Sequence, residues 1–267
     1  MPNELPKLLA QLRFQGMAEV LEPLLAKADA EALPVTEVLR VLLSEELRHR
    51  QERSLAYRLE QAKLPWQWSL ETFPFGQQPG VNPAQIKSLG ALDFIPRAQN
   101  LVFIAPPGTG KTGLAIGLLR QALISGYRGR FYKAQDLFDE LYASLADRST
   151  SRLLNRLSRY DLLLIDELGY LTLKPEQVNA FFKLLDLRYS QRPSIITTNL
   201  DYPEWYDLFQ RKPLVDALLD RLQHHCITIR IDGPSLRVPD PDPASSQRSR
   251  KKTHPKKNHE PSLSSTD

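Results

Sequence analysis

The stretch "LVFIAPPGTGKTGLA", residues 101–115, constrains the fold of this chain more than any other segment. It opens with an apolar run typical of a buried strand, passes through a loop with two glycines, and ends in a helix-forming segment. This succession matches the phosphate-binding pattern G-x-x-x-x-G-K-[ST], in which backbone N–H groups at a helix N-terminus surround nucleotide phosphates. The pattern predicts an α/β domain built on a parallel sheet flanked by helices.

The loop departs from this pattern at one position, because Ala105 stands where the first glycine is usual. Pro106 and Pro107 have no N–H group, so the donors to the phosphates must lie from Gly108 to Thr112. Ala105 precedes those donors, and its methyl group removes none of them. We expect Lys111 to reach the β and γ phosphates of ATP and Thr112 to bind Mg²⁺. The expected nucleotide-binding residues are Pro107, Gly108, Thr109, Gly110, Lys111, Thr112 and Gly113.

A second apolar run, in "DLLLIDELGYL", ends in the carboxylates Asp166 and Glu167. In a parallel sheet these side chains lie at the carboxyl edge, beside the phosphate-binding loop. We expect Asp166 to hold Mg²⁺ together with Thr112. Glu167 is expected to orient and deprotonate the attacking water. The pair therefore predicts hydrolysis of ATP, because a protein that only binds nucleotide needs no base.

Two weaker signals follow in order along the chain. The run "SIITTN" is a buried strand ending in Asn199, whose amide is expected to position the attacking water or sense the γ-phosphate. Arg221 follows an apolar helical stretch, and Arg237 follows the strand "ITIRI". Arginine suits the negative charge that develops on the transferred phosphoryl group. Taken alone, each also fits an ordinary turn amide or surface arginine.

Apolar spacing and composition divide the chain of 267 residues into four regions. The first is helical, and its long segment "EELRHRQER" is charged nearly all round, which indicates a helix partly free of a core. The last has almost no large apolar residue and is expected to be a disordered basic tail. The predicted boundaries are 1–70 for the helical domain, 71–98 for a connector, 99–237 for the nucleotide-binding domain and 238–267 for the tail.

The connector region carries aromatic residues that have two interpretations. They either pin the segment against a core or offer a stacking surface for nucleic acid. These residues are Trp66, Trp68, Phe73 and Phe75.

Composition bears on the cellular compartment of the protein and on the kinds of site it can contain. The formal net charge is +4 and the only cysteine is Cys226, so no internal disulfide is possible and a reducing cytoplasm is expected. No run approaches the ~20 apolar residues that a membrane span needs. His224, His225 and Cys226 are adjacent, and adjacent residues on a strand point to opposite faces, so they are not expected to bind one metal ion.

The motifs "APPGTGKTGLA", "LLLIDELGYL", "TTN" and "LLDRLQHH…GPSLR" occur in an order that resembles the AAA+ ATPases of the DnaC and IstB group. In the N-terminal half, "LRFQGMAEVLE" and "IKSLGALDFIPRAQN" are similar to the IstB type. Those proteins are helper ATPases of bacterial insertion sequences, encoded beside a transposase. The resemblance runs from about Leu12 to Arg237.

The resemblance implies a role for each site residue. Lys111 and Thr112 correspond to Walker A, Asp166 and Glu167 to Walker B, Asn199 to sensor 1, Arg237 to sensor 2, and Arg221 to an arginine finger that reaches the nucleotide of a neighbouring subunit. Three positions depart from the family pattern: Ala105 replaces glycine, Gly113 stands where histidine is frequent, and Leu236 stands where tyrosine is usual.

The resemblance also implies how the protein acts. Subunits would form a homo-oligomer head to tail, as a ring or a spiral. With ATP bound, the assembly would bind and bend double-stranded DNA and activate a cognate transposase of the IstA type. A replicative helicase loader like DnaC is the alternative, and the partner distinguishes the two. A small-molecule kinase is a third interpretation, which the sequence disfavours because it shows no sign of an acceptor pocket or a lid.

Overall fold

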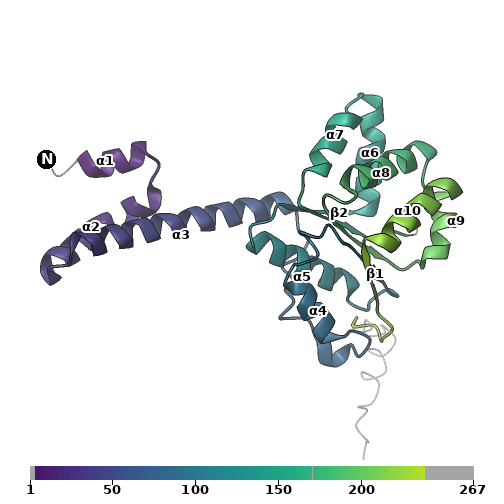
Figure 1. Ribbon diagram of the computed structural model, residues 1–267, viewed down its shortest axis with the longest axis horizontal. Helices are drawn as coiled ribbons and strands as arrows, with labels where there is room; N and C mark the ends of the chain where they lie inside the picture. Colours follow the sequence, from purple (N-terminus) through teal and green to yellow (C-terminus); the bar gives the residue numbers. More distant parts are fainter. Residues whose placement is uncertain (1–3, 170, 238–267) are drawn as a thin grey trace, which may run out of the picture.

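The computed structural model describes residues 4–169 and 171–237, so the predicted tail lies outside the described residues. Its centre is a parallel sheet of five strands in the order β2-β3-β4-β1-β5 (Figure 1). The strands are β1 (Asn100–Ile104), β2 (Gly129–Lys133), β3 (Leu162–Asp166), β4 (Ser194–Thr198) and β5 (Cys226–Arg230). The predicted parallel sheet flanked by helices is confirmed.

The strands form where the sequence is continuously apolar, because both faces of the sheet are covered. Every residue of β3 and β4 is buried. Side chains of β1 alternate between the two faces: Val102 packs with one buried cluster and Leu101 with the other. The register pairs Ile165 of β3 with Ile196 of β4, so the carboxyl ends of these strands meet at one edge.

Helices cover both faces of the sheet. On one side lie α4 (Pro83–Gly90), α5 (Lys111–Ile124) and the end of α3. On the other side lie α6 (Ala134–Ala146), α7 (Thr150–Ser158), α8 (Pro175–Arg188), α9 (Trp205–Phe209) and α10 (Lys212–His224). Among the described helices, none is long and apolar enough to cross a membrane.

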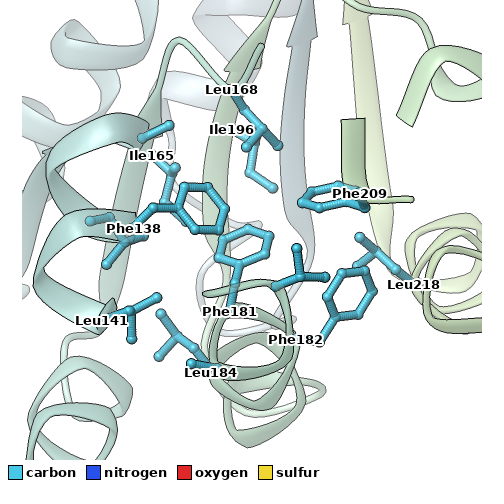
Figure 2. Packing of buried hydrophobic residues seen from close by; sticks show 14 of the residues in the cluster. Phe138, Leu141, Ile165, Leu168, Phe181, Phe182, Leu184, Ile196, Phe209 and Leu218 are labelled. Carbon is cyan, nitrogen blue, oxygen red and sulfur yellow. The ribbon is translucent and has the colours of Figure 1, made fainter. Parts of the chain in front are cut away.

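A group of phenylalanine rings packs together within the core on the α8 side of the sheet (Figure 2). Phe181 of α8 lies between Phe138 of α6, at 4.9 Å between ring centroids, and Phe209 of α9, at 5.8 Å. Such aromatic pairs contribute about 0.5–1.5 kcal/mol each beyond the area they bury. They fix α6, α8 and α9 against the strands that carry the site.

The N-terminal region is helical, as predicted, and projects away from the sheet (Figure 1). It contains α1 (Glu4–Gln11), α2 (Gln15–Glu31) and α3 (Val35–Ala62). A small cluster of Leu9, Met17 and Leu21 holds α1 and α2 together. One face of α3 carries an apolar stripe that stays exposed in this chain, so the helix is partly free of a core: Val35, Leu39, Leu43 and Leu47.

A buried carboxylate joins α2 to α3. Glu46 of α3 accepts hydrogen bonds from the backbone N–H groups of Gly16, at 2.9 Å, and Met17, at 3.3 Å. These donors belong to the first turn of α2, where helix N–H groups have no partner within the helix. Arg50, one turn further along α3, pairs with the same carboxylate at 2.7 Å.

The segment predicted as a connector packs against the nucleotide-binding domain. It contains the 3₁₀ turn η1 (Phe75–Gln77) as well as α4. Phe73 is buried in the core that contains α5, and Phe75 packs against this core. Those two aromatic residues therefore fit the packing interpretation. Trp66 and Trp68, by contrast, are not part of the core and are substantially exposed.

Candidate active site

A cleft of about 690 Å³ opens at the carboxyl edge of the sheet. Parallel α/β sheets bind ligands at this edge, where the loops after the strands converge. Its volume lies in the ordinary range for small-molecule sites. The lining includes Pro107, Gly108, Gly110, Lys111, Thr112, Gly113, Glu167, Asn199 and Arg237 among the predicted residues, and also Trp66, Trp68, Lys133, Gln135, Gly169, Leu171 and Leu236.

The loop after β1 adopts the conformation that its glycines permit. Gly108 and Gly110 have φ angles of +84° and +91°, which side chains disfavour. Ala105 is absent from the positive-φ residues of the described chain, is buried, and donates its N–H to the Thr198 carbonyl at 3.1 Å. Alanine is tolerated there because the position needs neither a left-handed backbone nor free space.

Thr109 lies beneath the loop and does not line the cleft. It is buried, and its hydroxyl donates to the Pro106 carbonyl at 2.9 Å. Its own carbonyl accepts from Gln78, at 3.0 Å, and the same amide also donates to the Pro234 carbonyl at 2.9 Å. Gln78 thus ties the loop to the segment before Arg237. No local sequence pattern singles out Gln78, because its partners lie 31 and 156 positions away.

Lys111 begins α5, where a helix N-terminus and a cation together suit phosphate. Its ammonium donates to the Pro106 carbonyl at 3.4 Å. Burial lowers the pKa of Lys111, while the nearby carboxylates of Asp166 and Glu167 oppose that shift. A phosphate would give this partly desolvated cation its counter-charge.

Asp166 and Thr112 lie together, as predicted. The Thr112 hydroxyl donates to Asp166 Oδ1 at 2.8 Å, and burial raises the pKa of Asp166. A hydroxyl and a carboxylate beside a phosphate loop are oxygen ligands that suit Mg²⁺, which keeps water and phosphate as its other ligands. In the parts of the chain described here, three or more His, Cys, Asp or Glu residues do not gather into a metal-binding group.

Glu167 follows β3 in a left-handed conformation, with φ of +60°, and its side chain is exposed in the cleft. Non-glycine residues in this region are strained, and such strain is frequent at functional sites. The Glu167 N–H donates to Thr197 Oγ1 at 3.0 Å, and the Thr197 hydroxyl donates to Asp166 Oδ1 at 2.5 Å. One threonine therefore holds both carboxylate-bearing residues. This positioning role was not predicted from the sequence, although two threonines at the end of a buried strand are a visible signal.

Asn199 and Arg237 also reach the cleft. Gly169 lies against Asn199, since a methyl group on residue 169 would stand 2.5 Å from Asn199 Oδ1. The segment before Arg237 is attached to the phosphate loop, because the Leu236 N–H donates to the Gly108 carbonyl at 2.8 Å.

Arg221 is the one predicted catalytic residue that lies outside the cleft. Its guanidinium pairs with Asp186 of α8 at 2.8 Å and lies 5.5 Å from the ring centroid of Tyr189. Its side chain is 37% exposed. The structure therefore brings together every predicted catalytic and metal-binding residue except this arginine.

The strand order, the glycine loop and the paired Asp166 and Glu167 define a P-loop ATPase fold of the AAA+ class. Two solved structures share this fold. The DnaC helicase loader is 24% identical with a TM-score of 0.54, covering 62% of this chain and 98% of that one. The replication initiator DnaA bound to AMPPCP and single-stranded DNA is 23% identical with a TM-score of 0.54, covering 64% and 52%.

Within this class, the chain belongs to the family of IstB-like ATP binding proteins, whose family model matches residues 7–242. An ATP-binding protein of insertion sequence IS21 from Pseudomonas aeruginosa is 36% identical over 236 residues, 88% of this chain and 89% of the relative. A counterpart from insertion sequence IS5376 of Geobacillus stearothermophilus is 34% identical over 228 residues, 85% and 91% of the two chains. The predicted family resemblance is confirmed.

Proposed function

We propose that this protein is a helper ATPase of transposition that, with ATP and Mg²⁺ bound, assembles on double-stranded DNA in the cytoplasm and activates a cognate transposase. The observation that carries the proposal is the cleft, in which a phosphate loop, Thr112 with its buried partner Asp166, and the candidate base Glu167 converge. Its relatives from insertion sequences favour transposition over helicase loading.

The arrangement around β3 supports hydrolysis. Mg²⁺ held by Thr112 and Asp166 would neutralise charge on the β and γ phosphates. Glu167 is exposed in the cleft and its backbone is fixed by Thr197, so its carboxylate is available to accept a proton from water. Lys111 and Arg237 supply positive charge on the same cleft.

The position of Arg221 supports a head-to-tail oligomer. The residue lies outside the cleft of its own chain and keeps an exposed side chain. An arginine of this kind stabilises the transition state of a neighbour when the subunits associate through unlike faces. Each active site would then be complete only in the assembly.

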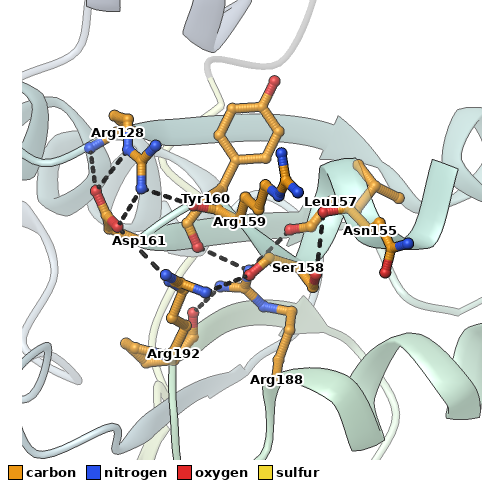
Figure 3. A network of polar contacts seen from close by, with 10 residues as sticks. Arg128, Asn155, Leu157, Ser158, Arg159, Tyr160, Asp161, Arg188 and Arg192 are labelled. Atoms are coloured by element: carbon orange, nitrogen blue, oxygen red, sulfur yellow. Dashed lines mark hydrogen bonds and ion pairs between the residues drawn. The ribbon is translucent and has the colours of Figure 1, made fainter. Parts of the chain in front are cut away.

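A concentration of positive charge supports DNA binding (Figure 3). It lies at the amino edge of the sheet, opposite the cleft, around a hollow of about 560 Å³. We define this arginine surface as Arg128, Arg152, Arg156, Arg159 and Arg192. Asp161 pairs with two of these residues and Glu140 with a third, whereas Arg152 and Arg159 form no ion pair within the described residues. The uncompensated charge suits phosphates of a DNA backbone.

A buried arginine fixes the backbone behind this surface (Figure 3). Arg188 of α8 donates to the carbonyls of Leu157, at 2.9 Å, and Tyr160, at 2.8 Å. It also donates to the Pro193 carbonyl and to Ser194 Oγ at the start of β4. Burial lowers the pKa of Arg188 to about 9, so the side chain stays cationic at neutral pH. The end of α7 is thereby held against the sheet.

The test is titration of a labelled DNA duplex at two salt concentrations, with and without ATP. Arg152→Gln combined with Arg159→Gln should weaken binding and lower the slope of log K against log salt by about two, since each lost phosphate contact lowers it by about one. The matched control combines Lys87→Gln with Lys183→Gln, which removes two exposed charges elsewhere. A Kd for the duplex that changes with neither salt concentration nor ATP would contradict the proposed ATP-dependent binding through the phosphate backbone.

The transposase partner is tested separately. A transposase gene directly upstream of this gene, and binding of its product to this chain on DNA with ATP, are the expected results. Binding to a replicative helicase in place of the transposase would identify a loader instead.

A further inference from the structure

Two tryptophans line the nucleotide cleft without taking part in the core. The chain has three tryptophans in all. Trp205 is completely buried, whereas Trp66 and Trp68 are 53% and 36% exposed. Both lie in the segment between α3 and η1, and both border the cleft. Large aromatic side chains that remain exposed beside a binding site suit a ligand with an apolar face.

The position of Trp68 relative to α5 is well defined. Its six-membered ring lies over Gly113, the residue directly after Thr112: a methyl group on residue 113 would stand 2.9 Å from Cε3 and 3.1 Å from Cζ3. The first distance is shorter than real contacts and the second is tighter than most, so a side chain on residue 113 would force the indole to shift. Leu70 lies against Gly117 one turn further on, which continues the contact along α5.

The two tryptophans line the same cleft as the phosphate loop, and Trp68 lies against the residue after Thr112. By the proposed function, Lys111, Thr112 and Asp166 would hold the β and γ phosphates and the metal ion. The nucleoside must therefore extend into a different part of the same cleft. The apolar wall formed by Trp66, Trp68 and Gly113 borders that cleft next to the phosphate loop.

We propose that Trp66 and Trp68 form the base subsite, in which the purine ring of ATP stacks on an indole face. The inference rests on nucleotide binding at the cleft and adds the residues that recognise the base. Stacking between a base and an aromatic side chain lowers Kd by about 10- to 100-fold. The two residues thus belong to ligand binding and distinguish a nucleotide from a bare polyphosphate.

The experiment compares ATP with inorganic tripolyphosphate, which has the phosphates but no base. Calorimetric titration of the full chain gives Kd for both ligands. Trp66→Leu combined with Trp68→Leu should raise the Kd for ATP by about 10- to 100-fold and leave the Kd for tripolyphosphate unchanged. Equal changes for both ligands, or an unchanged Kd for ATP, would overturn the proposal.

Two further variants keep the test independent of the folding of the double variant. Trp205→Phe leaves the two cleft indoles as the only tryptophans, so ATP should quench the fluorescence and tripolyphosphate should not. Gly113→Ala keeps both indoles but displaces Trp68, so it should raise the Kd for ATP more than the Kd for tripolyphosphate. Equal quenching by the two ligands contradicts base stacking. Failure of the wild-type chain to bind ATP at all would instead refute the proposed function.

Discussion

Arg221 allows a sharp test, because its contacts within the chain are too weak to explain a large loss of activity. Arg221→Ala removes an exposed ion pair with Asp186 and a cation–π contact with Tyr189. Exposed pairs contribute about 0–1 kcal/mol and exposed cation–π contacts about 0.5–1 kcal/mol. The free energy of unfolding should therefore fall by at most about 2 kcal/mol. Tm should fall by less than about 8 °C for a chain of this size.

The expected effect on hydrolysis is much larger. Loss of an arginine finger lowers turnover by about 10³-fold, which is a loss of about 4 kcal/mol of transition-state stabilisation. ATP should still bind almost normally, because Lys111 remains in the cleft and Asp166 remains bonded to Thr112 behind it. The assay measures steady-state phosphate release at saturating ATP and DNA, with thermal unfolding followed in parallel.

Asp186→Ala is the matched control. It removes the same ion pair but leaves the arginine, so it should cost similar stability and keep near-normal hydrolysis. A structural role for the pair predicts that both variants lose activity together.

Mixing separates action on a neighbour from action within one chain. Lys111→Ala lacks a working phosphate loop, and Arg221→Ala lacks the arginine, so neither variant alone contains a complete interface. A mixture should recover part of the ATPase rate when concentration or DNA supports assembly. No recovery in mixtures that sedimentation shows to be co-assembled would refute action in trans.

Three further predictions concern β3 and β4. Glu167→Gln should bind ATP but lose about 10²- to 10⁴-fold in turnover, measured by single-turnover hydrolysis, since glutamine accepts no proton; a near-normal rate would assign the base elsewhere. Thr197→Val should lower the turnover rate more than ATP affinity, because it frees both carboxylate-bearing residues; unchanged kinetics would contradict that positioning role. Burial raises the pKa of the Asp166 carboxyl above its ordinary value of 3.8, so the folded protein binds the carboxyl proton more tightly than the unfolded chain does. The free energy of unfolding therefore falls as pH rises from 3.8 through the raised pKa of the folded state. Asp166→Asn should therefore raise Tm at pH 7 without nucleotide, and an equal or lower Tm would contradict this reasoning.

The class of fold and most of the cleft could be predicted from the sequence alone. Contiguous motifs carry this information: the loop from Gly108 to Thr112, and the carboxylates at the end of β3. Their convergence follows from any parallel sheet, because all strands end at one edge. The same reasoning predicted Asn199 at this edge, where it lines the cleft, although the residue is weak as an isolated signal; its role stays a prediction.

The distant residues that complete the site become evident only from the way the chain packs in three dimensions. Gln78 bridges two loops, Thr197 holds both carboxylate-bearing residues, and Trp68 covers Gly113. Arg221 could not be placed from the sequence, since its surroundings depend on how α10 packs beside α8. The arginine surface combines side chains from three parts of the chain: Arg128 just before β2, the arginines on and after α7, and Arg192 just before β4. These contacts join residues about 30 or more positions apart, and their closeness follows from strand register and helix packing, which local patterns do not specify.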